Sequence, residues 1–253
     1  IKDAEQLAKQ GKPHYIEIQG AQYEGATVWF NTMVSSAGGT VLNPDATKIT
    51  LDARAVKALT IMKQLATSTA ADPSMSVQKE NENRLQMEAG NAAFQLNYPF
   101  VYPGMKTDNP KLFKVFKWAL YPEVVPGQPA KVTIGGIDLA VSSYSQHKDL
   151  AFQAALCLRN RENQLIGANV GGVPPTIASL YNDPKLFANY PFHADILKAL
   201  QNASVRPKTP VYQVVSIDIS HQISPAASIN PVSTLQAMKG SLSNALQSKG
   251  LVP

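Results

Sequence analysis

The chain reads GNAAFQLNYPF from residue 90 to 100, IGGIDLAVS from 134 to 142 and RPKTPVY from 206 to 212. The first two segments each predict a short strand, one running into aromatic residues and the other entered through a glycine pair. The third segment brings in Arg206 late in the chain, followed by prolines that restrict the backbone. Aromatic, glycine and arginine residues at strand ends and loops are therefore the informative features of this sequence.

The stretches around these segments predict helices that alternate with strands. Helices are expected at 1–11, 22–37, 55–66, 77–89, 143–158, 162–169, 176–181, 193–203 and 212–223, and in a closing stretch from Leu235 to a stop at Gly250. Strands are expected at 15–19, 48–51, 92–96, 118–121 and 137–141, with the rest of 102–131 irregular. This alternation predicts a layered α/β fold.

The composition is that of a folded protein with a substantial core. Hydrophobic residues make up 44% of the 253 residues and charged residues 16%, and no apolar run approaches the ~20 residues that span a bilayer. The single cysteine, Cys157, lies on the apolar face of an expected helix, where a small buried residue is the usual interpretation. The net charge of +5 is scattered, which favours a solvated surface over a nucleic-acid patch, so no nucleic-acid partner is expected.

The first residues are typical of the second half of a helix that stops at Gly11. The sequence has no initiator methionine and no signal peptide. We therefore expect the chain to be a C-terminal fragment of a longer protein, with any targeting or lipid signal in the missing part.

Motifs for catalysis, metals and cofactors are absent from the sequence. The histidines lie far apart in the chain: they are His14, His147, His193 and His221. They lack the spacing of a helix-borne zinc site, and no nucleophile elbow, phosphate loop or dinucleotide fingerprint occurs. Carboxylates such as Asp138, Glu17 and Glu24 would make a glycosidase pair only at the right separation in space, which the sequence does not give. No catalytic residue, metal or cofactor is expected.

The aromatic residues favour a sugar platform. Tyr98 and Phe100 flank Pro99, which fixes the direction of the backbone after the strand. Flat rings cover the C–H face of a sugar at little entropic cost, and Trp29 offers a further ring. The alternative is that Trp29 and Phe100 are core residues, as aromatic side chains at such positions often are.

The glycines and the arginine favour polar contacts to the same ligand. Gly135 and Gly136 let a ligand approach the backbone, because no side chain blocks the way. Arg206 offers five donors in a rigid fork that suits pairs of hydroxyl groups. The alternative for Arg206 is a surface residue or a salt bridge.

Taken in order, these segments resemble a known family. The resemblance covers 1–19, 35–39, 90–100, 134–142, the break at Pro174, 180–184 and 206–212. Together they are similar to the extracytoplasmic sugar-binding proteins of ABC importers, the group of maltose- and trehalose/maltose-binding receptors.

The resemblance implies a periplasmic-binding-protein-like fold of two α/β lobes that close over a sugar. It places 1–136 and 180–253 in the second lobe, and 137–179 across the hinge into the first. It implies sugar contacts from Asn97, Tyr98 and Phe100, from the backbone at Gly135, Gly136 and Ile137, and from Arg206. Relatives often have tryptophan in the aromatic pair and an aromatic residue at the position of Ile137.

The function implied by the resemblance is delivery of a disaccharide, such as trehalose or a related α-glucoside, to the permease subunits of an ABC transporter. The protein would lie on the outer side of the cell membrane, lipid-anchored through the missing N-terminal part, and would not be an enzyme. Two alternatives stay open on the residues alone: a carbohydrate-active enzyme with the same aromatic platform, and a basic module that binds anionic polymers.

Overall fold

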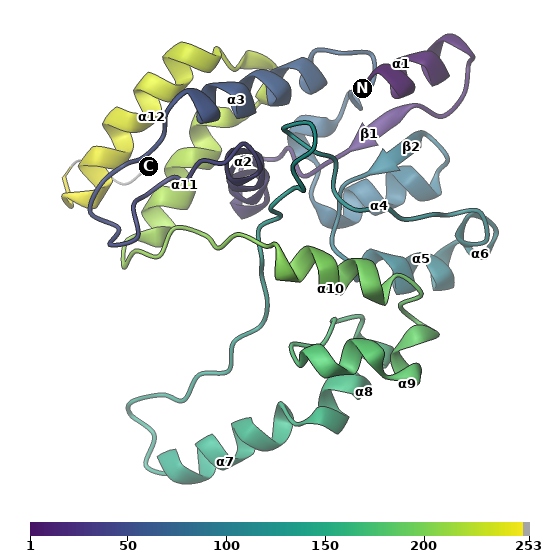
Figure 1. Ribbon diagram of the computed structural model, residues 1–253, viewed down its shortest axis with the longest axis vertical. Helices are drawn as coiled ribbons and strands as arrows, with labels where there is room; N and C mark the ends of the chain where they lie inside the picture. Colours follow the sequence, from purple (N-terminus) through teal and green to yellow (C-terminus); the bar gives the residue numbers. More distant parts are fainter. Residues whose placement is uncertain (250–253) are drawn as a thin grey trace. The chain divides into compact units, whose positions relative to one another are not determined.

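The computed structural model describes residues 1–249, which form two compact units (Figure 1). Unit 1 comprises Ile1–Asn97, Leu120–Ile134 and the residues from Asn202 onward. Unit 2 comprises Tyr98–Ala119 and Gly135–Gln201. The units cut across the boundaries expected at 136 and 179, because residues 98–119 pack with 135–201; the assignment of segments to lobes remains a prediction.

Unit 1 contains a small parallel sheet. Helix α1 (Lys2–Lys9) leads into β1 (Tyr15–Glu17), which pairs with β2 (Ala92–Gln95). Helix α4 (Glu80–Glu88) packs against both strands, and the turn after it uses Gly90 at φ +78°, a backbone conformation that favours glycine. On the side of β1 away from β2, Ile16 forms a parallel bridge to Ala71, so three segments run parallel.

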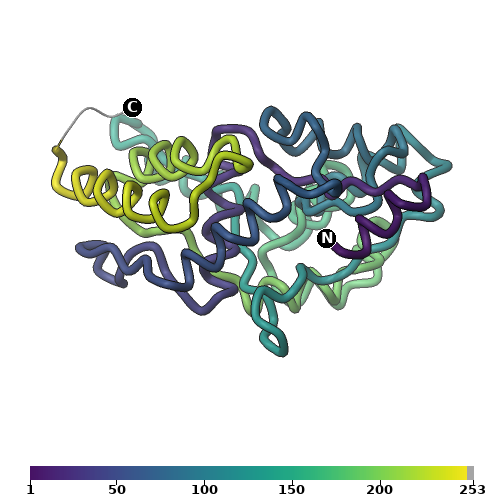
Figure 2. The backbone as a smooth tube through the Cα atoms, turned by 90° about the horizontal axis from the view of Figure 1, so that it is seen from above, coloured from purple at the N-terminus to yellow at the C-terminus, as the bar shows by residue number. Residues whose placement is uncertain are grey.

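The rest of unit 1 is a packed layer of helices. Helices α2 (Glu24–Ser36), α3 (Ala53–Ala66), α11 (Tyr212–Ile223) and α12 (Pro231–Leu246) contact one another in pairs, and Figure 2 shows α12 lying alongside α11. The expected face of α3 is confirmed, since Ala55, Leu59 and Met62 are fully buried. Two short 3₁₀ turns, η1 (Met75–Val77) and η3 (Ala226–Ser228), complete the unit.

Capping residues set where these helices begin. Asp52 precedes α3 and accepts the backbone N–H of Arg54 at 2.9 Å. Asn230 precedes α12 and accepts the N–H of Ser233 at 3.2 Å, with proline in the first turn. The described part of α12 ends at Leu246, and the expected stop at Gly250 lies outside the described residues.

Unit 2 is built from helices. They are α5 (Val101–Asp108), α6 (Pro110–Phe113), α7 (Lys148–Leu158), α8 (Arg161–Gly171), η2 (Ala178–Asn182), α9 (Pro184–Phe187) and α10 (His193–Gln201). Its core joins α8, α9, α10 and η2 around Leu180, Tyr181, Leu186 and Tyr190. Arg161 supports it from outside through an ion pair with Asp183 at 3.0 Å.

Several expected elements are wrong. The strands expected at 48–51, 118–121 and 137–141 do not form, and the region after 102 contains α5 and α6 rather than an irregular connection. A strand needs a neighbour for its backbone groups, and Ile49 finds only one isolated bridge, to Leu42. The helix expected from residue 143 starts later, because α7 begins at Lys148 with His147 before it.

The predicted burial of Cys157 is wrong as well. Its thiol is free and exposed, and α7 contains no buried residue. Even its leucines are open to solvent: Leu150 is 63% exposed and Leu156 62%. The apolar pattern correctly marked a helix, but the described chain leaves Leu150, Cys157 and Leu158 exposed. Across residues 1–249, no helix combines the length and apolar character needed to cross a bilayer.

Candidate ligand-binding site

Arg206 follows a short ribbon formed by two distant parts of unit 1. Thr133 and Ser204 form a parallel bridge: Ser204 donates its N–H to the carbonyl of Val132 at 2.9 Å, and Ile134 donates to the carbonyl of Ser204 at 2.8 Å. Arg206 then turns back along the ribbon, and its Nη1 donates to the carbonyl of Ile134 at 2.9 Å. The guanidinium is thereby held beside the residue that precedes the glycine pair.

Arg206 also forms an ion pair with Glu24, the first residue of α2. Glu24 Oε1 accepts from Arg206 Nε at 2.7 Å and from the hydroxyl of Tyr212 at 2.5 Å. Its other oxygen, Oε2, accepts from the hydroxyl of Ser216. Tyr212 and Ser216 are four residues apart on α11, so they face Glu24 from the same side of that helix.

The surroundings of Tyr212 keep its hydroxyl protonated. Burial raises the pKa of Tyr212 above its ordinary value, and the hydrogen bond to Glu24 raises it further. Tyr212 therefore stays a donor at neutral pH. Thr27 continues the network by donating to the backbone carbonyl of Ser216 at 2.8 Å.

Buried polar residues of α2 attach the ribbon to the core. Asn31 donates to the hydroxyl of Thr133 at 2.9 Å and to the carbonyl of Val205 at 3.2 Å. Thr32 accepts the N–H of Thr133 at 3.0 Å. All three side chains are buried, so each bond satisfies groups that would otherwise be costly to remove from water. The residue before Arg206 is thus fixed to α2 independently of Glu24.

The start of α2 is tightly packed. A Cβ on Gly25 would lie 2.2 Å from the hydroxyl oxygen of Tyr23, so only glycine fits there without a shift. Lys79 stands over the ring of Tyr23, 5.2 Å from its centroid. Glu24 therefore lies between two closely packed residues, Tyr23 and Gly25.

The predicted aromatic pair lies in unit 2. Tyr98 is half-buried, and Phe100 is 37% exposed just before α5. A Cβ on Gly172, which has φ +71°, would lie 3.5 Å from Cβ of Phe100, so this glycine packs closely against the base of that side chain. The backbone of the pair is fixed while one ring remains accessible.

An aromatic cluster supports the helix that follows this pair. The ring of Tyr102 on α5 contacts Phe113 at 4.7 Å, Phe192 at 4.9 Å and Trp118 at 5.9 Å between centroids. Burial raises the pKa of Tyr102. Trp118 is 40% exposed, and its position within this cluster was not recognised in the sequence.

The glycine pair and its neighbour are open. Gly135, Gly136 and Ile137 are exposed, Ile137 to 75%, and a Cβ on Gly136 would meet nothing within 4 Å. The backbone here is exposed, and its contact with a ligand stays a prediction.

Two predicted residues have local structural contacts. Asn97 Nδ2 donates to the carbonyl of Glu80 at 2.9 Å, which ties the end of the β2 region to the start of α4. Trp29 is only 5% exposed and belongs to the core of unit 1, which favours the packing interpretation of this ring.

The sequence-predicted residues therefore fall into two groups. Arg206, Trp29 and Asn97 belong to unit 1, and Tyr98, Phe100, Gly135, Gly136 and Ile137 belong to unit 2. The structure adds Glu24, Tyr212 and Ser216 as the direct supports of Arg206. The signal for them was weak, because an acid at a helix start and hydroxyls four residues apart are common in any protein.

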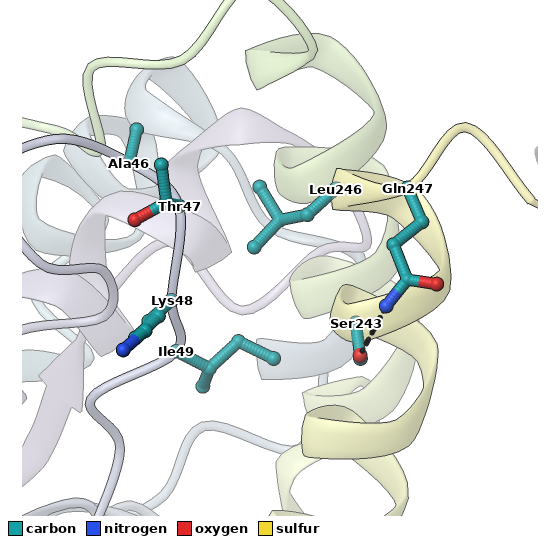
Figure 3. A pocket seen from close by; sticks show the side chains of 7 residues that line it. All are labelled: Ala46, Thr47, Lys48, Ile49, Ser243, Leu246 and Gln247. Atoms are coloured by element: carbon teal, nitrogen blue, oxygen red, sulfur yellow. Dashed lines mark hydrogen bonds between the residues drawn. The ribbon is translucent and has the colours of Figure 1, made fainter.

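A separate cavity of about 560 Å³ lies between the 46–49 loop and α12. Figure 3 shows Ile49 and Leu246 directed into it, with Ser243 and Gln247 on the rim. None of the predicted ligand residues lines it. Within residues 1–249 no cluster of three or more histidine, cysteine or acidic side chains is arranged to hold a metal ion.

The fold agrees with comparisons to known proteins. Residues 1–164 match the family model for bacterial extracellular solute-binding proteins, and the chain belongs to this family. A curated relative from Deinococcus radiodurans, named "Probable ABC transporter-binding protein", is 35% identical over 195 residues, which are 76% of this chain and 46% of the relative.

Solved structures show the same fold. A maltose-bound MalE3 of T. maritima superposes with a TM-score of 0.81 at 25% identity, covering 94% of this chain and 62% of that protein. The GacH receptor of Streptomyces glaucescens, solved unliganded and with acarbose, gives 0.79 at 21% identity, covering 98% and 62%. The predicted periplasmic-binding-protein-like α/β class is confirmed. The chain spans about half the length of the curated relative and about three fifths of these structures.

Proposed function

We propose that the chain is part of the solute-binding component of an ABC importer, and that this component binds a disaccharide and delivers it to the permease subunits. The observation that carries the proposal is the rigid presentation of Arg206, held by Glu24 and by the carbonyl of Ile134 next to an open glycine pair. A fork of fixed donors beside accessible backbone is suited to the hydroxyl groups of a sugar.

The ligand class follows from the relatives and from the aromatic pair. Maltose and acarbose are bound by the similar proteins of T. maritima and S. glaucescens. We propose trehalose or a related α-glucoside, since the segments at 97–102 and 206–212 resemble those of the mycobacterial trehalose-recycling lipoprotein receptor. Tyr98 and Phe100 would stack on the sugar, while Asn97, Gly135, Gly136 and Ile137 would complete the wall.

The proposal extends to location and organisation. An extracytoplasmic position follows the family, and a lipid anchor follows the resemblance to a lipoprotein receptor. Residues 1–136 and 180–253 would form one lobe of the cleft, with 137–179 crossing the hinge. A site made from both lobes releases its ligand when they open, which suits a delivery protein.

The test is ligand-induced stabilisation of the full-length gene product, meaning this chain with whatever further sequence its gene encodes. Trehalose, maltose, sucrose and glucose are each added during thermal unfolding, and hits are confirmed by calorimetry. A ligand that binds only the native state raises the melting temperature by mass action. We expect a selective rise with an α-linked disaccharide.

Other outcomes would refute the proposal. If no sugar raises the melting temperature, the proposal that the ligand is a sugar is refuted. Cleavage of the sugar during incubation would favour a carbohydrate-active enzyme. Affinity for a polyanion that falls steeply with salt would favour the basic module, because binding to phosphates releases counterions. Sugar binding through neutral hydroxyls should change little with salt.

A further inference from the structure

The donors of Arg206 divide into two sets. A guanidinium has five N–H groups. One, on Nε, goes to Glu24 at 2.7 Å, and one on Nη1 goes to the carbonyl of Ile134 at 2.9 Å. The other three have no protein acceptor among residues 1–249, and the side chain is 30% exposed. Three directed N–H groups therefore remain for a ligand.

Both carboxylate oxygens of Glu24, in contrast, already accept hydrogen bonds from the protein. Oε1 receives two bonds, from Arg206 and from Tyr212, and Oε2 receives the hydroxyl of Ser216. Glu24 is also the first residue of α2, where the partial positive charge of the helix N-terminus suits an acidic side chain. Glu24 is therefore the acidic partner of Arg206, and both of its oxygens are already engaged by side chains of the protein.

Charge pairing changes what an arginine recognises. A guanidinium without a carboxylate partner binds sulfate, phosphate or carboxylate groups through two parallel charged bonds. When Glu24 holds Nε and supplies the compensating charge, the remaining N–H groups still donate to hydroxyls but attract anions weakly. The same contact that orients the fork thus removes its preference for an oxyanion.

We propose that Glu24 is a positioning and specificity-determining residue, which makes the Arg206 site select neutral polyhydroxyl ligands and reject anionic ones such as sugar phosphates and sugar acids. The inference rests on the proposed sugar-binding function and adds its charge selectivity. It is carried by the hydrogen bonds that join Glu24 to Arg206, Tyr212 and Ser216, all of them within unit 1.

The decisive variant is Glu24→Gln, which keeps the shape of the side chain and removes its charge. Binding of trehalose by the full-length gene product is measured by calorimetry in sodium chloride and in sodium sulfate of equal ionic strength. We expect wild-type affinity to be the same in both salts. In Glu24→Gln we expect an affinity about tenfold lower in chloride, equal to about 1.4 kcal/mol, and a further loss in sulfate as the anion competes.

Two control variants separate charge from geometry. Asp45→Asn makes the same change in net charge on an exposed turn of unit 1, and we expect no sulfate effect. Tyr212→Phe removes one bond to Glu24 but leaves the ion pair. It should lower affinity equally in both salts, because the fork is less well oriented but still neutralised.

The outcomes are distinguishable from failure of the proposed function. Sulfate competition in the wild-type protein, or tight binding of trehalose 6-phosphate by it, overturns the inference without any variant. A Glu24→Gln protein that is equally weak in both salts also overturns it. If the wild type binds no neutral disaccharide, the proposed function fails. In that case the melting temperatures of the three proteins are compared with and without sulfate. A rise for Glu24→Gln, but not for wild type or Asp45→Asn, would show that Glu24 masks the charge of Arg206, and equal behaviour of the three would overturn the inference.

Discussion

The substitution Arg206→Lys tests whether the planar fork or only the charge matters at the proposed site. Lysine keeps a positive charge near Glu24 but cannot also reach the carbonyl of Ile134 with fixed geometry, and it has no counterpart to the three free N–H groups. A bond from a charged donor contributes about 1.5–3 kcal/mol to stability. The Arg206 and Glu24 side chains are 30% and 39% exposed, so we expect a stability loss near the lower end of that range.

The effect on binding should exceed what the stability loss explains. We expect Arg206→Lys to lose at least tenfold in disaccharide affinity, about 1.4 kcal/mol, and nearly as much as Arg206→Ala, while remaining folded. Calorimetry on the full-length gene product measures the affinity, and urea unfolding measures the stability.

Arg54→Lys is a matched control. Arg54 is also paired with a carboxylate, that of Asp52 at 2.5 Å, and also donates to a carbonyl, that of Gly38 at 2.6 Å. The substitution Arg54→Lys should therefore leave the disaccharide affinity unchanged. Near-normal binding by Arg206→Lys would reduce Arg206 to a surface charge and refute the clamp.

Two further predictions concern the aromatic pair and a buried acid. Replacing Tyr98 or Phe100 by alanine should cost about 1–3 kcal/mol of sugar binding with little change in the ligand-free melting temperature; an unfolded Phe100→Ala protein would instead mark a core ring. Glu17 is fully buried beside Asp72, and burial, reinforced by the charge of Asp72, raises its pKa from 4.5 to about 8. The native state then holds a proton that the unfolded chain releases across that window. Stability should therefore fall as pH rises through it, by up to about 1.4 kcal/mol per pH unit, and Glu17→Gln should flatten the profile in urea unfolding.

The sequence predicted the helices of unit 1 well because their burial is periodic. Ala55, Leu59 and Met62 are fully buried on one face of α3, as the spacing required. The strands at β1 and β2 were also confirmed, though shorter than expected. Both kinds of prediction depend on local patterns that one element carries by itself.

The failures depend on neighbours that a pattern does not contain. Residues 137–141 alternate like a strand, but Ile137 and Leu139 are exposed and the segment has no paired neighbour in the described chain. Backbone groups in a strand need a partner strand, so alternation alone cannot make one. Cys157 shows the same limit for burial, since an apolar helical face is buried only where something covers it.

The candidate site was predicted in part for the same reason. Arg206 and the glycine pair carry distinctive chemistry at their own positions, so the sequence proposed both, and their contact with a ligand stays a prediction. Glu24 was noted only as one acid among several, because its partner Arg206 is 182 residues away and Tyr212 is 188 residues away. Such a pair becomes visible only when tertiary structure brings the residues together.

The role of Arg206 follows most strongly from how many independent contacts fix it. A surface arginine with one carboxylate partner is mobile and contributes little. Here the ribbon before it is bonded to Asn31 and Thr32 on α2, and the guanidinium is bonded to Glu24 on the same helix and to Ile134 on the ribbon. Since one helix holds both the backbone and the side chain, the fork cannot shift unless α2 shifts. Side-chain freedom is lost during folding rather than on binding, which is the condition under which a few N–H groups can add affinity.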